Sequence, residues 1–181
     1  MLNQLPNKCI KVILKFYNQV YLSGQLTAAW KYSIVIGFPK PSKNESLPTS
    51  YRPISLTSTI CKVFERLAAN RLTYVLEKNN LLSNLQAGFR KDRSTTDQIV
   101  RLQDIINKYL NNRGYTLAVF LDFEKAFDMV WKNGLLIKLK HLKISGNMFN
   151  FINNSLSYRT IQMRVDDALS SIYSLGNTAQ G

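Results

Sequence analysis

The sequence predicts an α+β fold, on the strength of two observations. Residues 60–78 and 94–110 carry apolar side chains at the three- and four-residue spacing of an amphipathic helix. Residues 33–41, 115–121 and 159–175 hold short apolar or alternating runs that are typical of strands. With 181 residues, of which 45% are hydrophobic, the chain is long enough for one domain, or for two small lobes that share a core.

Capping residues mark the starts of the two strongest helices. Ser58 or Thr59 can cap the first, because a side-chain oxygen at that position accepts a bond from an unpaired amide of the first turn. Ser94 and Asp97 have the spacing of a capping box at the start of the second, which is expected to stop near Gly114.

Two further segments are expected to be helical. Apolar residues recur at helical spacing over residues 10–17, and residues 134–156 look helical with a break at Ser145-Gly146. Residues 43–53 are polar and contain two prolines, which predicts a loop.

Residues 115–121, YTLAVFL, are the main candidate for a central strand. They are apolar on both faces, which is typical of a strand buried in the middle of a sheet. Residues 159–165 and 171–175 alternate around a turn and are expected to form its neighbours, backed by the helices between residues 134 and 156.

The net charge of +13 is unevenly distributed along the chain. Residues 1–113 hold 17 Lys and Arg against 6 Asp and Glu, and residues 114–181 hold 7 against 5. Such a basic excess is the usual footprint of a nucleic-acid partner, although a solvated basic surface explains it equally well. The best internal boundary lies near Gly114, where this balance changes.

Cysteine and hydropathy patterns indicate an intracellular protein, in the cytoplasm or the nucleus. Cys9 and Cys61 are far apart and belong to no CxxC pair, which disfavours a disulfide framework or a zinc site. No apolar run approaches the ~20 residues of a membrane span, so no membrane partner is expected. His141, the single histidine, is expected on a helix surface.

Asp122 directly follows the predicted central strand, within VFLDFEKAFDMVW. A carboxylate at the end of a buried strand can emerge into a cleft, where it offers the oxygen ligand that Mg²⁺ prefers. Enzymes that transfer phosphoryl groups with two metal ions need more than one such ligand. The alternative is an aspartate that caps the following helix.

The segment around Asp122, FLDFEKAFD, does not stand alone. The other blocks of interest are WKYSIVIGFPKPSK, SYRPISLTSTICKVFERLAANRL, LLSNLQAGFRKDRSTTDQI and RTIQMRV with LGNTAQG. Taken in their order along the chain, the five blocks resemble the reverse transcriptase domain of non-LTR (LINE) retrotransposons, particularly the jockey-like type. The resemblance covers practically the whole chain.

The resemblance implies a right-hand, polymerase-like architecture. Residues 1–113 would be the mostly helical, basic fingers, and residues 114–181 an incomplete palm with an antiparallel sheet backed by helices. The implied function is that of a fragment of an RNA-directed DNA polymerase, using an RNA template, a DNA primer and deoxynucleoside triphosphates. Mg²⁺ or Mn²⁺ would serve a complete active site, and the rest of the palm and the thumb would belong to the parent protein.

Around Asp122, the resemblance implies separate roles for neighbouring residues. Asp122 corresponds to the first catalytic, metal-binding aspartate, and the backbone carbonyl of Phe123 to a further ligand. Phe127 corresponds to the aromatic that crowds the 2′ position of the sugar, with a core phenylalanine as the alternative. Glu124 is expected at the surface and Asp128 in a structural role.

Other residues correspond to nucleotide-binding positions of the family. Lys40 and Arg52 match cations that meet the incoming triphosphate, although Lys40 can equally be a solvated loop lysine. Arg90 is assigned to template contact or nucleotide-pocket support, with a surface role as the alternative. Gln180 and Gly181 match the end of a nucleotide-binding block that the family writes PQG, where this chain has Ala in place of Pro.

The Asp166-Asp167 pair differs from the second catalytic block of the family, an aromatic, any residue and two aspartates. It precedes the AQG block, has no aromatic in the expected place, and lies where a turn is predicted. We therefore interpret it as a turn and expect this chain alone to be inactive, because the true Asp-Asp block is absent. The alternatives are a non-catalytic nucleic-acid-binding remnant and a translated transposon fossil.

Overall fold

The computed structural model describes residues 4–124, 126 and 129–175, which form two compact units. The first, here called the sheet unit, combines Met1–Leu72 with Met129–Gly181, and the second, the α4 unit, is Thr73–Asp128. The α+β class is confirmed. The predicted boundary at residue 113 falls inside the α4 unit, and the division into fingers and palm stays a prediction.

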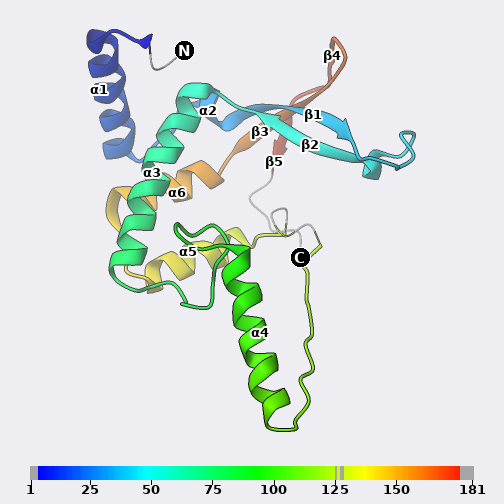
Figure 1. Cartoon of the computed structure of the whole chain (residues 1–181). Helices are drawn as coiled ribbons and strands as arrows, with labels where there is room; N and C mark the ends of the chain where they lie inside the picture. The colour runs from blue at the N-terminus through cyan, green and yellow to red at the C-terminus, as the bar shows by residue number, and fades with distance from the viewer. Residues whose placement is uncertain (1–3, 125, 127–128, 176–181) are drawn as a thin grey trace. The chain divides into compact units, whose positions relative to one another are not determined.

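Every long helix that the sequence predicts is present (Figure 1). The break at Ser145-Gly146 is also confirmed, because it separates two of them. In chain order, the helices are α1 (Asn7–Ser23), α2 (Ala28–Lys31), α3 (Thr59–Lys78), α4 (Thr95–Asn111), α5 (Lys132–His141) and α6 (Gly146–Leu156).

The described strands all belong to the sheet unit. They are β1 (Tyr32–Pro39), β2 (Tyr51–Leu56), β3 (Arg159–Val165), β4 (Ala168–Leu169) and β5 (Tyr173–Leu175). The order is β2-β1-β3-β4, and β5 also pairs with β3. The sheet is mixed: β1 and β3 run parallel, whereas the other pairs are antiparallel.

The predicted loop over residues 43–53 is wrong at its end, because β2 already begins at Tyr51. Pro53 lies inside β2 and pairs with Gly37. Proline has no N–H to donate to a neighbouring strand. β2 tolerates it because β2 is an edge strand, which pairs on one side only. The ring of Tyr51 lies against Gly37, where an added Cβ would come within 3.2 Å of it.

An aromatic cluster centred on Phe64 holds the helices of the sheet unit together. Phe64, from α3, packs on Tyr17 of α1, Trp30 of α2 and Phe151 of α6, with ring centroids 5.1, 5.6 and 5.2 Å away. All four side chains are buried. The Tyr17 hydroxyl donates to the Ile60 carbonyl at 2.7 Å, so burial leaves this polar group paired.

The α4 unit has a different construction, with few buried side chains. Ser94 and Asp97 form the predicted capping box at the start of α4, and no residue of this helix is fully buried. The strand predicted over residues 115–121 is wrong for the described structure: the segment is extended, unpaired and largely exposed. A strand requires hydrogen bonds to a neighbour, and the described part of this unit contains no other strand.

None of the described helices is both long enough and apolar enough to span a bilayer.

Replacing the central aromatic should destabilise the protein. We expect Phe64→Ala to lower the free energy of unfolding by about 3–5 kcal/mol, because it leaves a cavity between three other rings. Leu22→Ala is the control on α1, where the side chain is 69% exposed, and should change stability by less than about 0.5 kcal/mol. Urea unfolding measures both, and equal effects would contradict this account.

The two cysteines should differ in reactivity. Burial raises the pKa of the Cys61 thiol to about 12 and leaves its side chain inaccessible, whereas Cys9 is exposed. We expect a maleimide at pH 7 to label one thiol per folded chain and two in urea, because the thiolate is the reactive form. The Cys9→Ser variant should remain unlabelled when folded, and rapid labelling of that variant would contradict the buried position.

Candidate active site

Asp122 lies in the α4 unit, at the end of the exposed segment 115–121. Its carboxylate is exposed, and its neighbours Leu121 and Phe123 are 88% and 82% exposed. The expectation that it ends a buried strand is therefore wrong here, although the carboxylate is accessible as a metal ligand must be. Phe127, Lys125 and Asp128 lie outside the described residues.

The described residues do not complete a metal centre. Asp122 and the carbonyl of Phe123 are hard oxygen donors of the kind that Mg²⁺ binds. However, no three His, Cys, Asp or Glu side chains gather as a possible metal-binding group in the described ranges. Asp122 thus fits as one ligand of a metal ion, and the described part of the chain supplies no set that would hold the ion by itself.

Lys40 follows β1 and closes the loop that leads to β2. Its amide donates to the carbonyl of Ser50, and its ammonium donates to the carbonyl of Thr49, both at 2.8 Å. An ammonium has three N–H donors, so two remain for another acceptor. The side chain therefore has a loop-closing role, which is compatible with a phosphate contact.

Arg52 lies on β2, on the same hairpin as Lys40. It pairs in the antiparallel register with Phe38 and is exposed. Within the described ranges, its guanidinium has no hydrogen-bond or ion-pair partner. The hairpin thus brings the two cations predicted to meet a triphosphate to the same end of the sheet.

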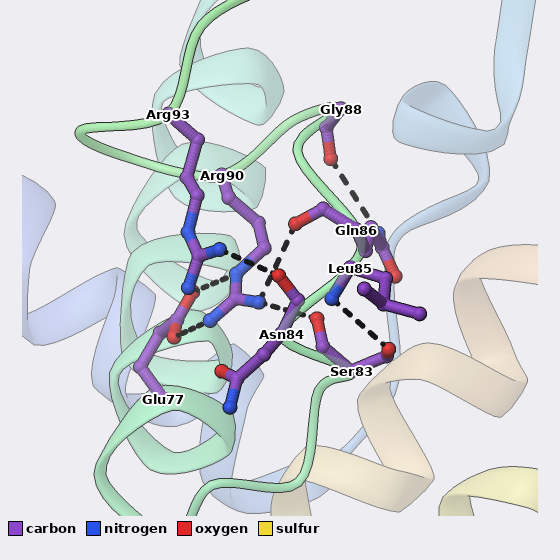
Figure 2. A network of polar contacts seen from close by, with 8 residues as sticks. All are labelled: Glu77, Ser83, Asn84, Leu85, Gln86, Gly88, Arg90 and Arg93. Carbon is purple, nitrogen blue, oxygen red and sulfur yellow. Dashed lines mark hydrogen bonds and ion pairs between the residues drawn. The ribbon is translucent and has the colours of Figure 1, made fainter. Parts of the chain in front are cut away.

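Arg90 is engaged in a structural network (Figure 2). Its Nε donates to Glu77 Oε1 at 2.8 Å, its Nη2 donates to the other oxygen of Glu77, and its Nη1 donates to the Ser83 carbonyl at 2.7 Å and to that of Gln86 at 3.5 Å. The Arg90 side chain is only 7% exposed. Of its five N–H donors, at most one is left for a nucleic acid.

The network ties the loop after α3 to the end of that helix. Arg93 adds a hydrogen bond from its Nη1 to the Asn84 carbonyl at 2.7 Å. Figure 2 shows both guanidinium groups directed into the loop, with Glu77 on α3 beneath them. The sequence pattern does not predict a role for Glu77. A Glu thirteen positions before an Arg has no periodic signature, so only the folded loop reveals the pair.

Asp166 and Asp167 form the turn between β3 and β4, as predicted. Asp166 has a φ of 52°, a left-handed conformation that Asp adopts more readily than most residues. Both side chains are exposed. Gln180 and Gly181 lie outside the described residues.

Comparison with known proteins identifies the family. The family model for reverse transcriptase (RNA-dependent DNA polymerase) matches residues 38–181. The chain belongs to this family. It is 36% identical over 169 residues to a probable RNA-directed DNA polymerase from transposon BS of Drosophila melanogaster, and 33% over 168 to the RNA-directed DNA polymerase from mobile element jockey of that fly.

The match covers much of this chain but little of its relatives. These two alignments each take in 93% of the chain and 18% of the relative. A retrovirus-related Pol polyprotein from the type-1 retrotransposable element R2 of Popillia japonica is 29% identical, over 80% of the chain and 20% of its own length. The chain thus spans about a fifth of these relatives, and the resemblance to non-LTR, jockey-like reverse transcriptases is confirmed.

The Glu77–Arg90 pair should make stability depend on pH. Hydrogen bonds from Arg90 hold the pKa of Glu77 below its ordinary value. A carboxyl whose pKa is lower in the folded state stabilises that state above its unfolded pKa of about 4.3, and this stabilisation disappears as pH falls through the folded pKa. Wild type should therefore lose stability on acidification, and Glu77→Gln should lose less.

Urea unfolding at several pH values between about 6 and 2.5 measures this difference, with hydrogen exchange of residues 79–94 as the local readout. Asp104→Asn, an exposed position of α4, is the matched control and should follow wild type. Identical pH curves for wild type and Glu77→Gln would contradict the proposed coupling.

Proposed function

We propose that this chain provides the nucleotide-binding and first catalytic segments of an RNA-directed DNA polymerase. The observation that carries the proposal is the family match over residues 38–181, which includes Lys40, Arg52 and Asp122. The substrates would be deoxynucleoside triphosphates, an RNA template and the 3′-hydroxyl of a DNA primer. In this assignment residues 1–113 are the fingers and residues 114–181 belong to the palm.

Each described residue has a distinct part in this proposal. Arg52 presents a planar guanidinium without a protein partner in the described structure, so it can bind two phosphate oxygens at once. Lys40 adds a second positive charge. Its ammonium also closes the loop between β1 and β2 by donating a hydrogen bond to the Thr49 carbonyl. Asp122 contributes a carboxylate to a divalent ion, Mg²⁺ or Mn²⁺, whose chemistry would be to offset charge on the reacting phosphates.

Further assignments follow the family pattern, and those of Phe127, Gln180 and Gly181 fall outside the described residues. Phe127 would select deoxynucleotides by crowding the sugar, and Gln180 with Gly181 would line the nucleotide site. Arg90 holds the loop after α3 in place, and through this loop it would support the nucleotide pocket. Catalysis in this scheme also needs the aromatic-any-Asp-Asp block, so this chain by itself is expected to be inactive.

The proposal predicts that Asp122→Asn abolishes primer extension. The measurement uses an RNA template, a DNA primer and Mg²⁺, with the chain extended through the second catalytic block. Asn removes the charge while keeping the shape, and at this exposed position it should leave thermal unfolding unchanged. Asp167→Asn, in the β3–β4 turn, is the matched control and should retain activity.

Extension by the Asp122→Asn variant would overturn the metal assignment, and extension by the 181-residue chain itself would overturn the expectation that it is inactive. Loss of activity in Asp167→Asn with an unchanged fold would show that the pair is more than a turn.

A second candidate function is nucleic-acid binding without catalysis. The observation that favours it is the basic excess of the chain, together with the incomplete set of metal ligands among the described residues. Under this alternative, the affinity for RNA falls steeply with salt concentration. The affinity in EDTA equals that in Mg²⁺, and the Asp122→Asn variant binds RNA as tightly as wild type. Filter binding or fluorescence anisotropy at several salt concentrations distinguishes it from a metal-dependent role.

A further inference from the structure

Two cations, Lys31 and Arg159, lie at the start of the two parallel strands of the sheet. Lys31 is the last residue of α2 and directly precedes β1, and Arg159 is the first residue of β3. The residues that follow them, Tyr32 and Thr160, pair in the parallel register, and β1 and β3 run next to each other in Figure 1. Because neighbouring strands are about 4.8 Å apart, the backbone pairing brings two like charges together.

No ion pair neutralises either cation among the described residues. Residues 1–44 and 129–165, which contain both of them, hold no Asp or Glu. Glu65 of α3 approaches from another element, but its carboxylate interacts with the Cys61 thiol, on which Arg159 also acts. The chain thus holds Lys31 and Arg159 close together without an acidic side chain bound to either.

The Lys31 ammonium is half-buried and has no hydrogen-bond acceptor among the described residues. Its Nζ lies 5.7 Å from the centroid of the Tyr158 ring. Lys40, which is also half-buried, differs because its ammonium donates to the Thr49 carbonyl. Burial and the Arg159 guanidinium both lower the pKa of Lys31, so more of it is the free, nucleophilic amine at neutral pH.

Arg159 can bind an anion beside this amine. Its Nη1 donates to the Ser155 carbonyl at 3.2 Å, and a guanidinium has five N–H donors, so up to four remain. The planar group binds two oxygens of a phosphate at once. A phosphate held by Arg159 would therefore lie close to the Lys31 amine.

We infer that Lys31 is a site of acylation by small acyl phosphates, with Arg159 binding the phosphate group. The Nζ lone pair attacks the acyl carbon and forms a C–N bond. The C–O bond to phosphate breaks, inorganic phosphate leaves with the electron pair, and the proton lost from nitrogen passes to water. The amide product carries no charge, so the modification removes the like-charge repulsion with Arg159. The inference is independent of the proposed function.

The first test compares Lys31 with Lys78 in the folded 181-residue chain. Lys78 is a matched control, because its Nζ is also 5.7 Å from a tyrosine ring centroid, that of Tyr74, but the side chain is exposed. The donors are acetyl phosphate and p-nitrophenyl acetate, an uncharged ester, and peptide mass spectrometry gives the rate of acetylation at each lysine.

We expect Lys31 to react about threefold or more faster than Lys78 with the ester, because a larger share of it is free amine. The ratio of the two rates should be larger still with acetyl phosphate, since Arg159 binds only this donor. In urea the two lysines should react at equal rates with either donor.

The second test changes the guanidinium. Arg159→Gln should lower the rate at Lys31 with both donors, and more with acetyl phosphate, by about threefold or more, because the phosphate also loses its binding group. Arg159→Lys should retain part of the preference. Arg164→Gln removes the same charge from an exposed position of β3 and should leave the rates unchanged. Thermal unfolding establishes that each variant is folded.

Equal rates at Lys31 and Lys78 in the folded chain would overturn the inference, and so would a preference that persists in urea. An equal effect of Arg159→Gln on both donors would overturn the phosphate-binding role. If that variant does not fold, equal Lys31-to-Lys78 ratios for the two donors in wild type would overturn it instead. No template, primer or divalent ion enters these measurements, so their outcome is separate from that of primer extension.

Discussion

The packing of Phe64 against three other aromatic rings is the constraint on which the sheet depends. β1 and β3 are far apart in the sequence and pair in parallel, so no hairpin can bring them together. Trp30 lies just before β1, and Phe151 lies in α6, which leads into β3. Because Phe64 contacts both rings, α3 holds in place the two helices from which the paired strands start.

Features that depend on neighbouring residues could be predicted from the sequence. The helix starting after Ser94 is an example, since its capping box needs only Asp97 three residues further on. The end of α3 is another, because the structure ends this helix at Lys78, the last residue of the predicted range 60–78. The fold class follows from the same local patterns, and the family resemblance located Lys40 and Arg52, which the structure brings to one hairpin.

Features that depend on distant partners could not be predicted in this way. Residues 115–121 have every local property of a strand, but pairing needs a neighbouring strand, which the described part of the α4 unit does not contain. Arg90 belongs to a block that resembles the nucleotide-binding region, yet its donors are taken by Glu77 and by carbonyls of its own loop. In both cases the outcome depends on where other parts of the chain lie.

The parallel pairing of β1 with β3 also restricts how the gene can change. Successive side chains along a strand point to opposite faces of the sheet. One residue inserted between Gln162 and Arg164 would therefore turn Arg164 to the face opposite its present one. The loop over residues 40–50 imposes no such alternation and can absorb additional codons at little cost. Length variation among descendants of this element should therefore accumulate in loops and spare the strands.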